Sequence, residues 1–322
     1  MQMETEDRLL EALRTKRGPF DGHTHSTISD GVLTPTNLCR LAVRKGIKHL
    51  AITDHDFPLR HREARMLSLR YMLDVIPGVE LNVIHQVRNR SVLVHLGLLW
   101  LPEDDEELNA LLAHNQNLPM ERYAIKMLQN LYILGLDPSG QGVENSYAML
   151  LQRNPGCEYI GKGHVAQLLV DTGLVSSRAE ASHLYLGEHG ERRAYVAKEN
   201  LFEYVRMAQI LKVISRLNHQ RETATVVTLN HPFHYRLEED LELLISDFSC
   251  LDGHCIEVHY PKHTPSKVDF LKTQCKKHGL LMNIGSDYHY DAHKLAAGDS
   301  NLFKTLLRVH RKDWQPLGKK WW

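Results

Sequence analysis

The sequence lacks the features that direct a chain to a membrane, an oxidising compartment or duplex nucleic acid. None of its apolar runs approaches the length of about 20 residues that a membrane-spanning helix needs. The first 18 residues, MQMETEDRLLEALRTKRG, lack the apolar core of a signal peptide. The five cysteines form no CxxC pair and are odd in number, which is typical of reduced thiols. Because 39 Lys and Arg balance 39 Asp and Glu, stable binding of duplex nucleic acid is not expected, and the absences together predict a cytoplasmic protein.

Histidine, in contrast, is abundant, with 21 residues among 322. Two histidines stand two positions apart in the stretch FDGHTHSTISDG, where His23 and His25 precede Asp30. Side chains at positions i and i+2 of a strand point to the same face. The pair can therefore aim two ring nitrogens at one metal ion.

Short apolar runs alternate with helix-like segments along much of the chain. Between the first two runs, Thr34 is a suitable helix N-cap, Pro35 a first helical residue and Gly46 a terminating glycine. A strand, a helix and a strand at this spacing predict a βαβ unit and a parallel sheet. The expected strands are residues 19–25, 48–53, 74–81, 91–99, 223–230, 254–260 and 280–286.

Residues 101–205 interrupt this alternation. Five segments in this region have helical patterns, and none reads as a strand. We expect a helical insertion at 101–205 within an α/β domain that is formed by residues 1–100 and 206–322.

Residues of the metal-ligand type follow most of the expected strands. In a barrel of parallel strands, the carboxyl ends of the strands meet at one mouth, where active sites lie. The spacing therefore predicts a shared metal centre at that mouth. The candidates at or near strand ends are His23, His25, His55, Glu80, His231, Asp287 and His289, with His95 inside the fourth strand and Asp30 in the turn after the first strand.

Each candidate also has an ordinary structural explanation when it is taken alone. His95 could be a hydrogen-bonded core histidine, and the Asp54–Asp56 segment could cap a helix. Ser29, Asp30 and Gly31 could form a simple turn. The ordered recurrence of these residues at strand ends favours metal binding over the separate explanations.

Seven motifs together resemble the PHP (polymerase and histidinol phosphatase) family. They are DGHTHSTISDGVLTP, AITDHD, PGVEL, VHLG, NHP, IEVHYPKHTP and GSDYH. The insertion is similar to that of a subgroup that acts on nucleotide phosphomonoesters. The resemblance implies a distorted, TIM-like (β/α)7 barrel with an inserted helical cap. It also implies two or three divalent ions at the mouth, of manganese, zinc or iron.

The resemblance further implies nine ligands in three sets, with one glutamate shared between two ions. These are His23, His25, Glu80 and Asp287 for the first ion, Glu80, His95 and His231 for the second, and Asp30, His55 and His289 for the third. Asp54 and Asp56 would orient ligands by hydrogen bonds without contacting the metal themselves.

Substrate residues are expected in the insertion. The resemblance implies that His164 faces the substrate, and a structural role for it is the alternative. Members of the subgroup usually carry arginine just before and shortly after this histidine, where this chain has Lys162 and Gln167. Lysine keeps the charge but lacks the planar fork that binds phosphate through two hydrogen bonds. Candidates to replace the missing charge are Arg122, Arg192 and Arg193, for which an exposed surface position is the alternative.

The implied activity is hydrolysis of a phosphomonoester by a hydroxide that bridges two ions. The expected substrate is a nucleotide: a nucleoside 5′-phosphate, a 3′,5′-bisphosphate or the 5′ end of a short oligonucleotide. His231 could protonate the leaving oxygen if it is not a ligand. The alternatives are a histidinol-phosphate phosphatase and a non-catalytic module stabilised by metal.

Histidines outside these motifs are expected on the surface. They are His49, His85, His114, His183, His189, His219, His263, His278 and His310.

Overall fold

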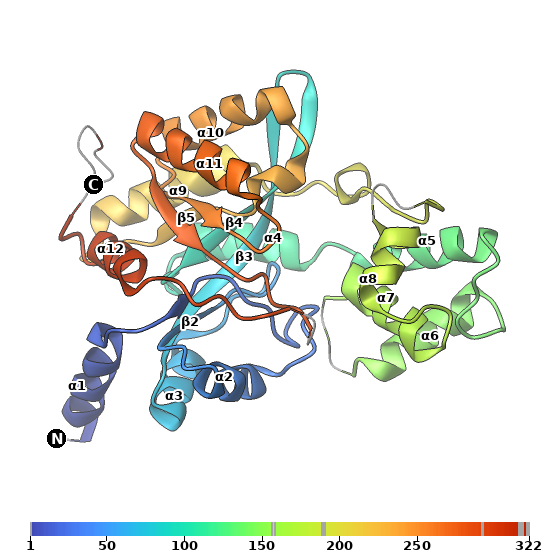
Figure 1. Ribbon diagram of the computed structural model, residues 1–322, viewed down its shortest axis with the longest axis horizontal. Coiled ribbons are helices and arrows are strands. Elements are labelled where there is room, and N and C mark those ends of the chain that lie inside the picture. Colours follow the sequence, from blue (N-terminus) through green and yellow to red (C-terminus); the bar gives the residue numbers. More distant parts are fainter. Residues whose placement is uncertain are drawn as a thin grey trace.

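The computed structural model describes residues 2–155, 157, 159–187, 191–290, 293–314 and 319. At its centre is a seven-stranded sheet in which each strand pairs with the next one along the chain (Figure 1). A strand occurs in each of the seven expected regions, but the third continues to Val87 instead of ending at residue 81, and the fourth begins at Arg90. The strands are β1 (Phe20–Asp21), β2 (His49–Ile52), β3 (Asp74–Val87), β4 (Arg90–Leu99), β5 (Val226–Leu229), β6 (Cys255–His259) and β7 (Leu281–Ile284).

The first and last strands approach each other and nearly close the sheet into a barrel. The backbone N–H of Gly22 donates to the carbonyl of Ile284 at 3.0 Å, and that of Asp287 donates to the carbonyl of His23 at 2.9 Å. The contact places the segment after β1 beside the segment after β7. The α/β barrel expected from the sequence is confirmed, and its closure joins two motifs that lie at opposite ends of the chain.

The expectation of a fully parallel sheet is wrong at β4. β3 and β4 are antiparallel over ten residue pairs, from Gly78 and Leu99 to Val87 and Arg90, and β4 is also antiparallel to β5. Only two residues join β3 to β4, too few for the crossover that parallel neighbours require. His95 therefore lies inside β4 and reaches the mouth from the middle of a strand.

Amphipathic helices cover the outside of the sheet. The helix expected after the first strand is confirmed: the Thr34 side chain accepts a hydrogen bond from the Asn37 N–H, Pro35 begins the helix, and Gly46 follows its end with φ of 77°. No helix in the described part of the chain is long and apolar enough to cross a membrane. The covering helices are α1 (Gln2–Thr15), α2 (Pro35–Arg44), α3 (His61–Tyr71), α4 (Glu106–Gln116), α9 (Met207–Gln220), α10 (Leu241–Cys250), α11 (Pro265–His278) and α12 (Ser300–His310).

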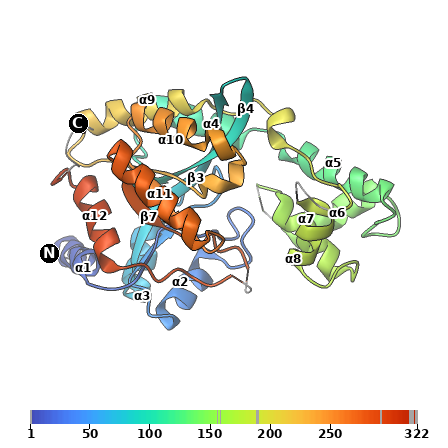
Figure 2. The same cartoon turned by 45° about the horizontal axis from the view of Figure 1, so that its top comes forward.

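The remaining α-helices form a separate lobe beside the barrel (Figures 1 and 2). They are α5 (Met120–Ile133), α6 (Val143–Arg153), α7 (Lys162–Asp171) and α8 (Arg178–Ala181). The buried apolar residues of the lobe form their own cluster, which begins at Met120 and ends at Tyr204. α4 belongs instead to the barrel, because Leu108 and Leu112 share a cluster with Ile210 of α9. The division at residues 101 and 205 stays a prediction, and the packing favours a lobe that begins after α4.

Surface positions were expected for nine histidines, and this is wrong for His49 and His310, which are buried. His49 Nδ1 lies 2.9 Å from Asp74 Oδ2, so its burial is compensated by a hydrogen bond. His189 lies outside the described residues. Of the others, three are half-buried and three are exposed: His85, His263 and His278, and then His114, His183 and His219.

The buried His310 makes stability depend on pH. Its Nδ1–H donates to the Ala224 carbonyl, and its ring stacks on Trp100 at 4.4 Å. Burial lowers the pKa of His310 from 6.5 to about 4. The unfolded chain therefore takes up this proton near pH 6.5 and the folded chain only near pH 4, so the contribution is complete above pH 6.5. We expect this residue to remove about 3 kcal/mol from the unfolding free energy as pH falls to 4.

Urea unfolding between pH 4 and pH 8 measures this effect. His310→Gln should reduce the loss of unfolding free energy at low pH, whereas His219→Gln, at an exposed position, should leave the loss unchanged. Identical pH profiles for the wild-type protein and both variants would contradict the assignment.

Candidate metal centre at the barrel mouth

The structure brings together the nine histidine and carboxylate side chains that the sequence selected. Eight of them fall into three clusters in which the potential ligand atoms lie within 4.8 Å of one another. The ninth, His231, places Nε2 3.0 Å from Glu80 Oε1. The clusters are His23, His25, Glu80 and Asp287; His25, Asp30, His55 and His289; and His55, Glu80 and His95.

The first cluster uses the histidine pair of the first strand. The Nε2 atoms of His23 and His25 lie 3.0 Å apart and point toward the same region. Glu80 Oε1 lies 3.1 Å from His23 Nε2, and Asp287 Oδ1 lies 3.3 Å from His25 Nε2. Both rings therefore face a shared centre, as the i, i+2 spacing predicts.

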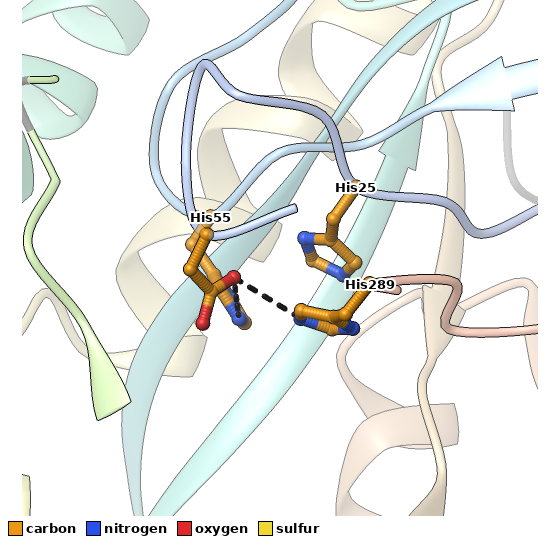
Figure 3. Close-up of side chains that lie close together, drawn as sticks. His25, His55 and His289 are labelled. Atoms are coloured by element: carbon orange, nitrogen blue, oxygen red, sulfur yellow. Dashed lines mark ion pairs between the residues drawn. The ribbon is translucent and has the colours of Figure 1, made fainter. Parts of the chain in front are cut away.

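The second cluster surrounds the Asp30 carboxylate. Asp30 Oδ1 lies 3.1 Å from His289 Nε2 and 3.8 Å from His55 Nε2. Figure 3 shows the rings of His25, His55 and His289 converging from three separate segments of the chain. The turn after β1 thus supplies a carboxylate to a centre beside the first one.

Glu80 links the clusters. Its Oε1 lies 3.3 Å from His95 Nδ1, and its Oε2 lies 3.0 Å from His55 Nδ1. His55 consequently faces Glu80 through one ring nitrogen and Asp30 through the other. The family resemblance implies His55 for one ion alone, whereas the geometry places this ring between two centres.

These residues fit divalent cations. Five buried polar atoms of the site have no hydrogen-bond partner, and an unpartnered buried polar atom is costly unless something else satisfies it. Nitrogen and carboxylate donors that lie about 3 Å apart suit an ion bound at about 2.0–2.2 Å from each of them. The mixed set accepts several metals and does not select one. The unpartnered atoms are Asp30 Oδ1, His55 Nδ1, Glu80 Oε2, His95 Nδ1 and His231 Nδ1.

Comparison with known proteins agrees with this geometry. The family model of the PHP domain matches residues 21–254, well over half of the chain. The chain belongs to the PHP family. This PHP protein is 27% identical over 295 residues to the 5′-3′ exoribonuclease of Haemophilus influenzae. The aligned region covers 91% of this chain and 98% of the relative.

Two further similarities concern Chromobacterium violaceum. The PHP protein is 29% identical over 276 residues to a 3′,5′-nucleoside bisphosphate phosphatase, covering 84% of this chain and 87% of the relative. It also matches the structure of an amidohydrolase with bound sulfate and no metal, with a TM-score of 0.69, 26% identity and coverage of 84% of this chain and 87% of that one. The family and the relatives together establish a metal-dependent phosphoesterase.

The charges of the PHP site balance one another. Burial alone would raise the pKa of Glu80, but the charges of His23, His95 and His55 hold this pKa well below its usual value. Burial alone would lower the pKa of His23, but Glu80 and Glu257 raise it well above its usual value. The carboxylate is therefore ionised and available to a cation, and a cation that binds here displaces the proton that His23 retains.

Glu257 is a member of the site that the sequence analysis missed. It is fully buried in β6, where Oε1 lies 3.0 Å from His23 Nδ1 and Oε2 accepts the backbone N–H of His231 at 2.7 Å. A carboxylate on Nδ1 leaves Nε2 of His23 free to bind a metal and fixes the orientation of the ring. The available signal was a single carboxylate in the apolar run HCIEVHY, and this pattern alone does not reveal the partner.

Asp54 and Asp56 orient the surroundings of the site rather than the imidazoles directly. Asp54 accepts hydrogen bonds from the backbone N–H and hydroxyl of both Ser26 and Ser29. It thereby fixes the turn that carries Asp30. Asp56 accepts from Asn82 and Asn115 and has φ of 56°. His231 and Asp287 also have positive φ, of 26° and 51°, and backbone strain of this kind clusters at functional sites.

A cavity of about 300 Å³ lies over the clusters, between the barrel and the lobe. Lys162 lines it, as expected from the sequence. His164 is buried, and its Nδ1 accepts the Gly161 N–H at 3.1 Å at the start of α7, which favours the structural alternative for this residue. The structure does not bring three expected arginines to the cavity; those exposed residues are Arg122, Arg192 and Arg193.

Three other cations line the cavity instead, and the sequence analysis missed them. They are Arg178, Lys198 and Lys262. Each comes from a different segment. Lys262 belongs to the motif IEVHYPKHTP, whereas Arg178 and Lys198 lie outside the seven motifs, so only the folded chain reveals that the three meet. With Lys162, they place four cationic side chains around a single cavity.

Proposed function

We propose that this enzyme hydrolyses a phosphoester of a nucleotide that carries phosphates on both its 3′ and 5′ oxygens. A free nucleoside 3′,5′-bisphosphate is the smallest such substrate. The observation that carries the proposal is the cavity, in which three donor clusters share a wall with four cations. Metal ions held by the clusters would bind one phosphate, and the four cationic side chains would bind a second one.

The names of two relatives support this choice of substrate. One relative is a 3′,5′-nucleoside bisphosphate phosphatase and another is a 5′-3′ exoribonuclease. The 5′ end of a phosphorylated RNA contains the same unit, a nucleoside flanked by a 5′ and a 3′ phosphate. A short RNA with a 5′ phosphate is therefore the second candidate substrate.

The nine clustered side chains would hold the ions. When bound, divalent ions lower the pKa of water and neutralise charge on phosphate. Glu257 and Asp54 hold His23 and the Asp30 turn in place, and the lobe covers the cavity. His231 directs Nε2 at Glu80 from 3.0 Å, so we favour a ligand role for it over a role as the acid.

The two alternatives fit less well. Histidinol phosphate has a single phosphate and a positively charged amine, which the four cations would repel. A non-catalytic module would need no complete set of ligands, whereas all nine expected side chains meet here.

A panel of substrates tests the proposal. Phosphate release or nucleotide products would be measured with added manganese for adenosine 3′,5′-bisphosphate, adenosine 5′-phosphate, a 5′-phosphorylated trinucleotide RNA and histidinol phosphate. We expect kcat/KM for the bisphosphate or the RNA to exceed that for the 5′-phosphate by at least about tenfold, as for one added charge-assisted hydrogen bond. Preference for histidinol phosphate over each nucleotide, or no turnover of any compound, would overturn the proposal.

A further inference from the structure

Arg178 and Gln167 form a hydrogen-bonded pair between α7 and α8. Arg178 Nε donates to Gln167 Oε1 at 2.8 Å, and Gln167 Nε2 donates to Asp171 Oδ1 at 2.7 Å. Gln167 is therefore itself held on both sides of its amide. The pair fixes the guanidinium through its inner nitrogen.

A second contact, with an aromatic ring, restrains the same guanidinium. Arg178 Cζ lies 5.4 Å from the centroid of the Tyr290 ring. Tyr290 follows the site residue His289 and, like Arg178, lines the cavity. A cation–π contact of this kind restrains the arginine side chain, so less rotamer freedom remains to be lost when a ligand binds.

The two outer nitrogens of Arg178 have no hydrogen-bond acceptor among the described residues. Within the described part of the chain, the Arg178 side chain makes one hydrogen bond, from Nε to Gln167. The negative charges of Asp30 and Asp171 act on Arg178 from a distance, but no ion pair within 4.0 Å joins Arg178 to a described carboxylate. A half-buried guanidinium with two free NH2 groups at a cavity wall suits an oxyanion that binds through two hydrogen bonds.

We propose that Arg178 binds a substrate phosphate other than the one that is hydrolysed, and that Gln167 is its positioning residue. The inference rests on the proposed function and names the residue that recognises the second phosphate. The hydrolysed phosphate must lie against the donor clusters, whereas Arg178 lies on the lobe and more than 4.0 Å from the Asp30 carboxylate. Gln167 lies on α7 and Arg178 begins α8, so the hydrogen bond between them places the guanidinium at the cavity wall.

Kinetics on two substrates test this role. Adenosine 3′,5′-bisphosphate has a second phosphate, and p-nitrophenyl phosphate does not. For Arg178→Ala we expect KM for the bisphosphate to rise about 10–100-fold with kcat little changed, the loss of one charge-assisted contact. The kinetics of p-nitrophenyl phosphate should stay within about twofold. Arg178→Lys, which keeps the charge but not the fork, should fall between the wild-type enzyme and the alanine variant.

Gln167→Met and Arg192→Ala serve as the paired variants. Gln167→Met keeps the size of the side chain but removes the acceptor, so it should raise KM for the bisphosphate less than Arg178→Ala does, again without lowering kcat. Arg192 is exposed and outside the cavity lining, so Arg192→Ala should behave as the wild-type enzyme. Calorimetric titration of metal-free protein with adenosine 3′,5′-bisphosphate should show the same order of affinities without any turnover.

Equal losses on both substrates would overturn the inference, because Arg178 would then act on the hydrolysed phosphate or on folding. An unchanged KM and affinity for the bisphosphate in Arg178→Ala would also overturn it. Failure of the proposed function would be seen in the wild-type enzyme, which would then turn over neither substrate. The two failures can therefore be distinguished.

Discussion

Replacing Glu80 with Gln should lower the phosphoesterase activity by at least about 10³-fold, because several kcal/mol of electrostatic stabilisation depend on the ions that this residue helps to hold. Glu80 is fully buried, and its two oxygens lie within 3.4 Å of five imidazoles. An amide keeps the shape but removes the charge and turns an NH2 group toward nitrogens that must bind a cation. Metal content by elemental analysis should fall together with kcat, while the circular dichroism spectrum stays that of the wild-type enzyme.

Substitutions of two other glutamates provide an intermediate case and a control for Glu80→Gln. Glu257→Gln leaves the ligands in place but weakens the orientation of His23, so we expect metal affinity to fall about 10–100-fold and activity to recover at high metal concentration. Glu239 is exposed, and Glu239→Gln should change neither quantity. Full activity and full metal content in Glu80→Gln would contradict the assignment of the site.

Gly285→Ala should damage both stability and activity through one methyl group. A Cβ at this position would lie 2.1 Å from Glu257 Oε1 and 2.3 Å from His23 Cβ, far inside van der Waals contact. Either the carboxylate or the histidine strand must move, at a cost of about 1–3 kcal/mol in the unfolding free energy. We also expect about 10–100-fold weaker metal binding, because the bond between Glu257 and His23 is disturbed. Urea unfolding and metal titration measure the two effects.

Gly173→Ala separates crowding from backbone strain. Gly173 has φ of 72°, and a Cβ there would meet no atom within 4 Å. Its replacement should cost about 1 kcal/mol of unfolding free energy and leave metal binding intact. If Gly285→Ala kept wild-type metal affinity, the close packing of His23, Glu257 and Gly285 would have no role in the site.

The sequence pattern predicted the presence of the strands better than their directions, as β3 and β4 show. The alternation of strands and helices predicts parallel neighbours, and this holds for β1 to β3 and for β5 to β7. The expected strands 74–81 and 91–99 left nine residues between them and gave no sign of a hairpin. The structure extends β3 to Val87, so two residues join it to β4 and no crossover fits. His95 still reaches Glu80, since the barrel interior is shared by strands of either direction.

The nine expected ligands could be found from the sequence because each lies in a short local pattern. His23 and His25 lie two residues apart, and Asp287 and His289 have the same spacing. Strand periodicity then decides which way neighbouring side chains point, and that is a local property of the backbone.

The sequence by itself determined the seven strands, the helical insertion and the nine side chains that meet at the mouth, since these follow from local periodicity and spacing. Only the tertiary structure decided that Glu257 contacts His23 and that Arg178, Lys198 and Lys262 line the cavity together with Lys162. His23 and Glu257 are 234 residues apart, and Arg178 meets Tyr290 across the boundary between lobe and barrel. Such contacts depend on how the closed sheet and the lobe pack together, and a single buried carboxylate or a single arginine in the sequence carries no record of its partner.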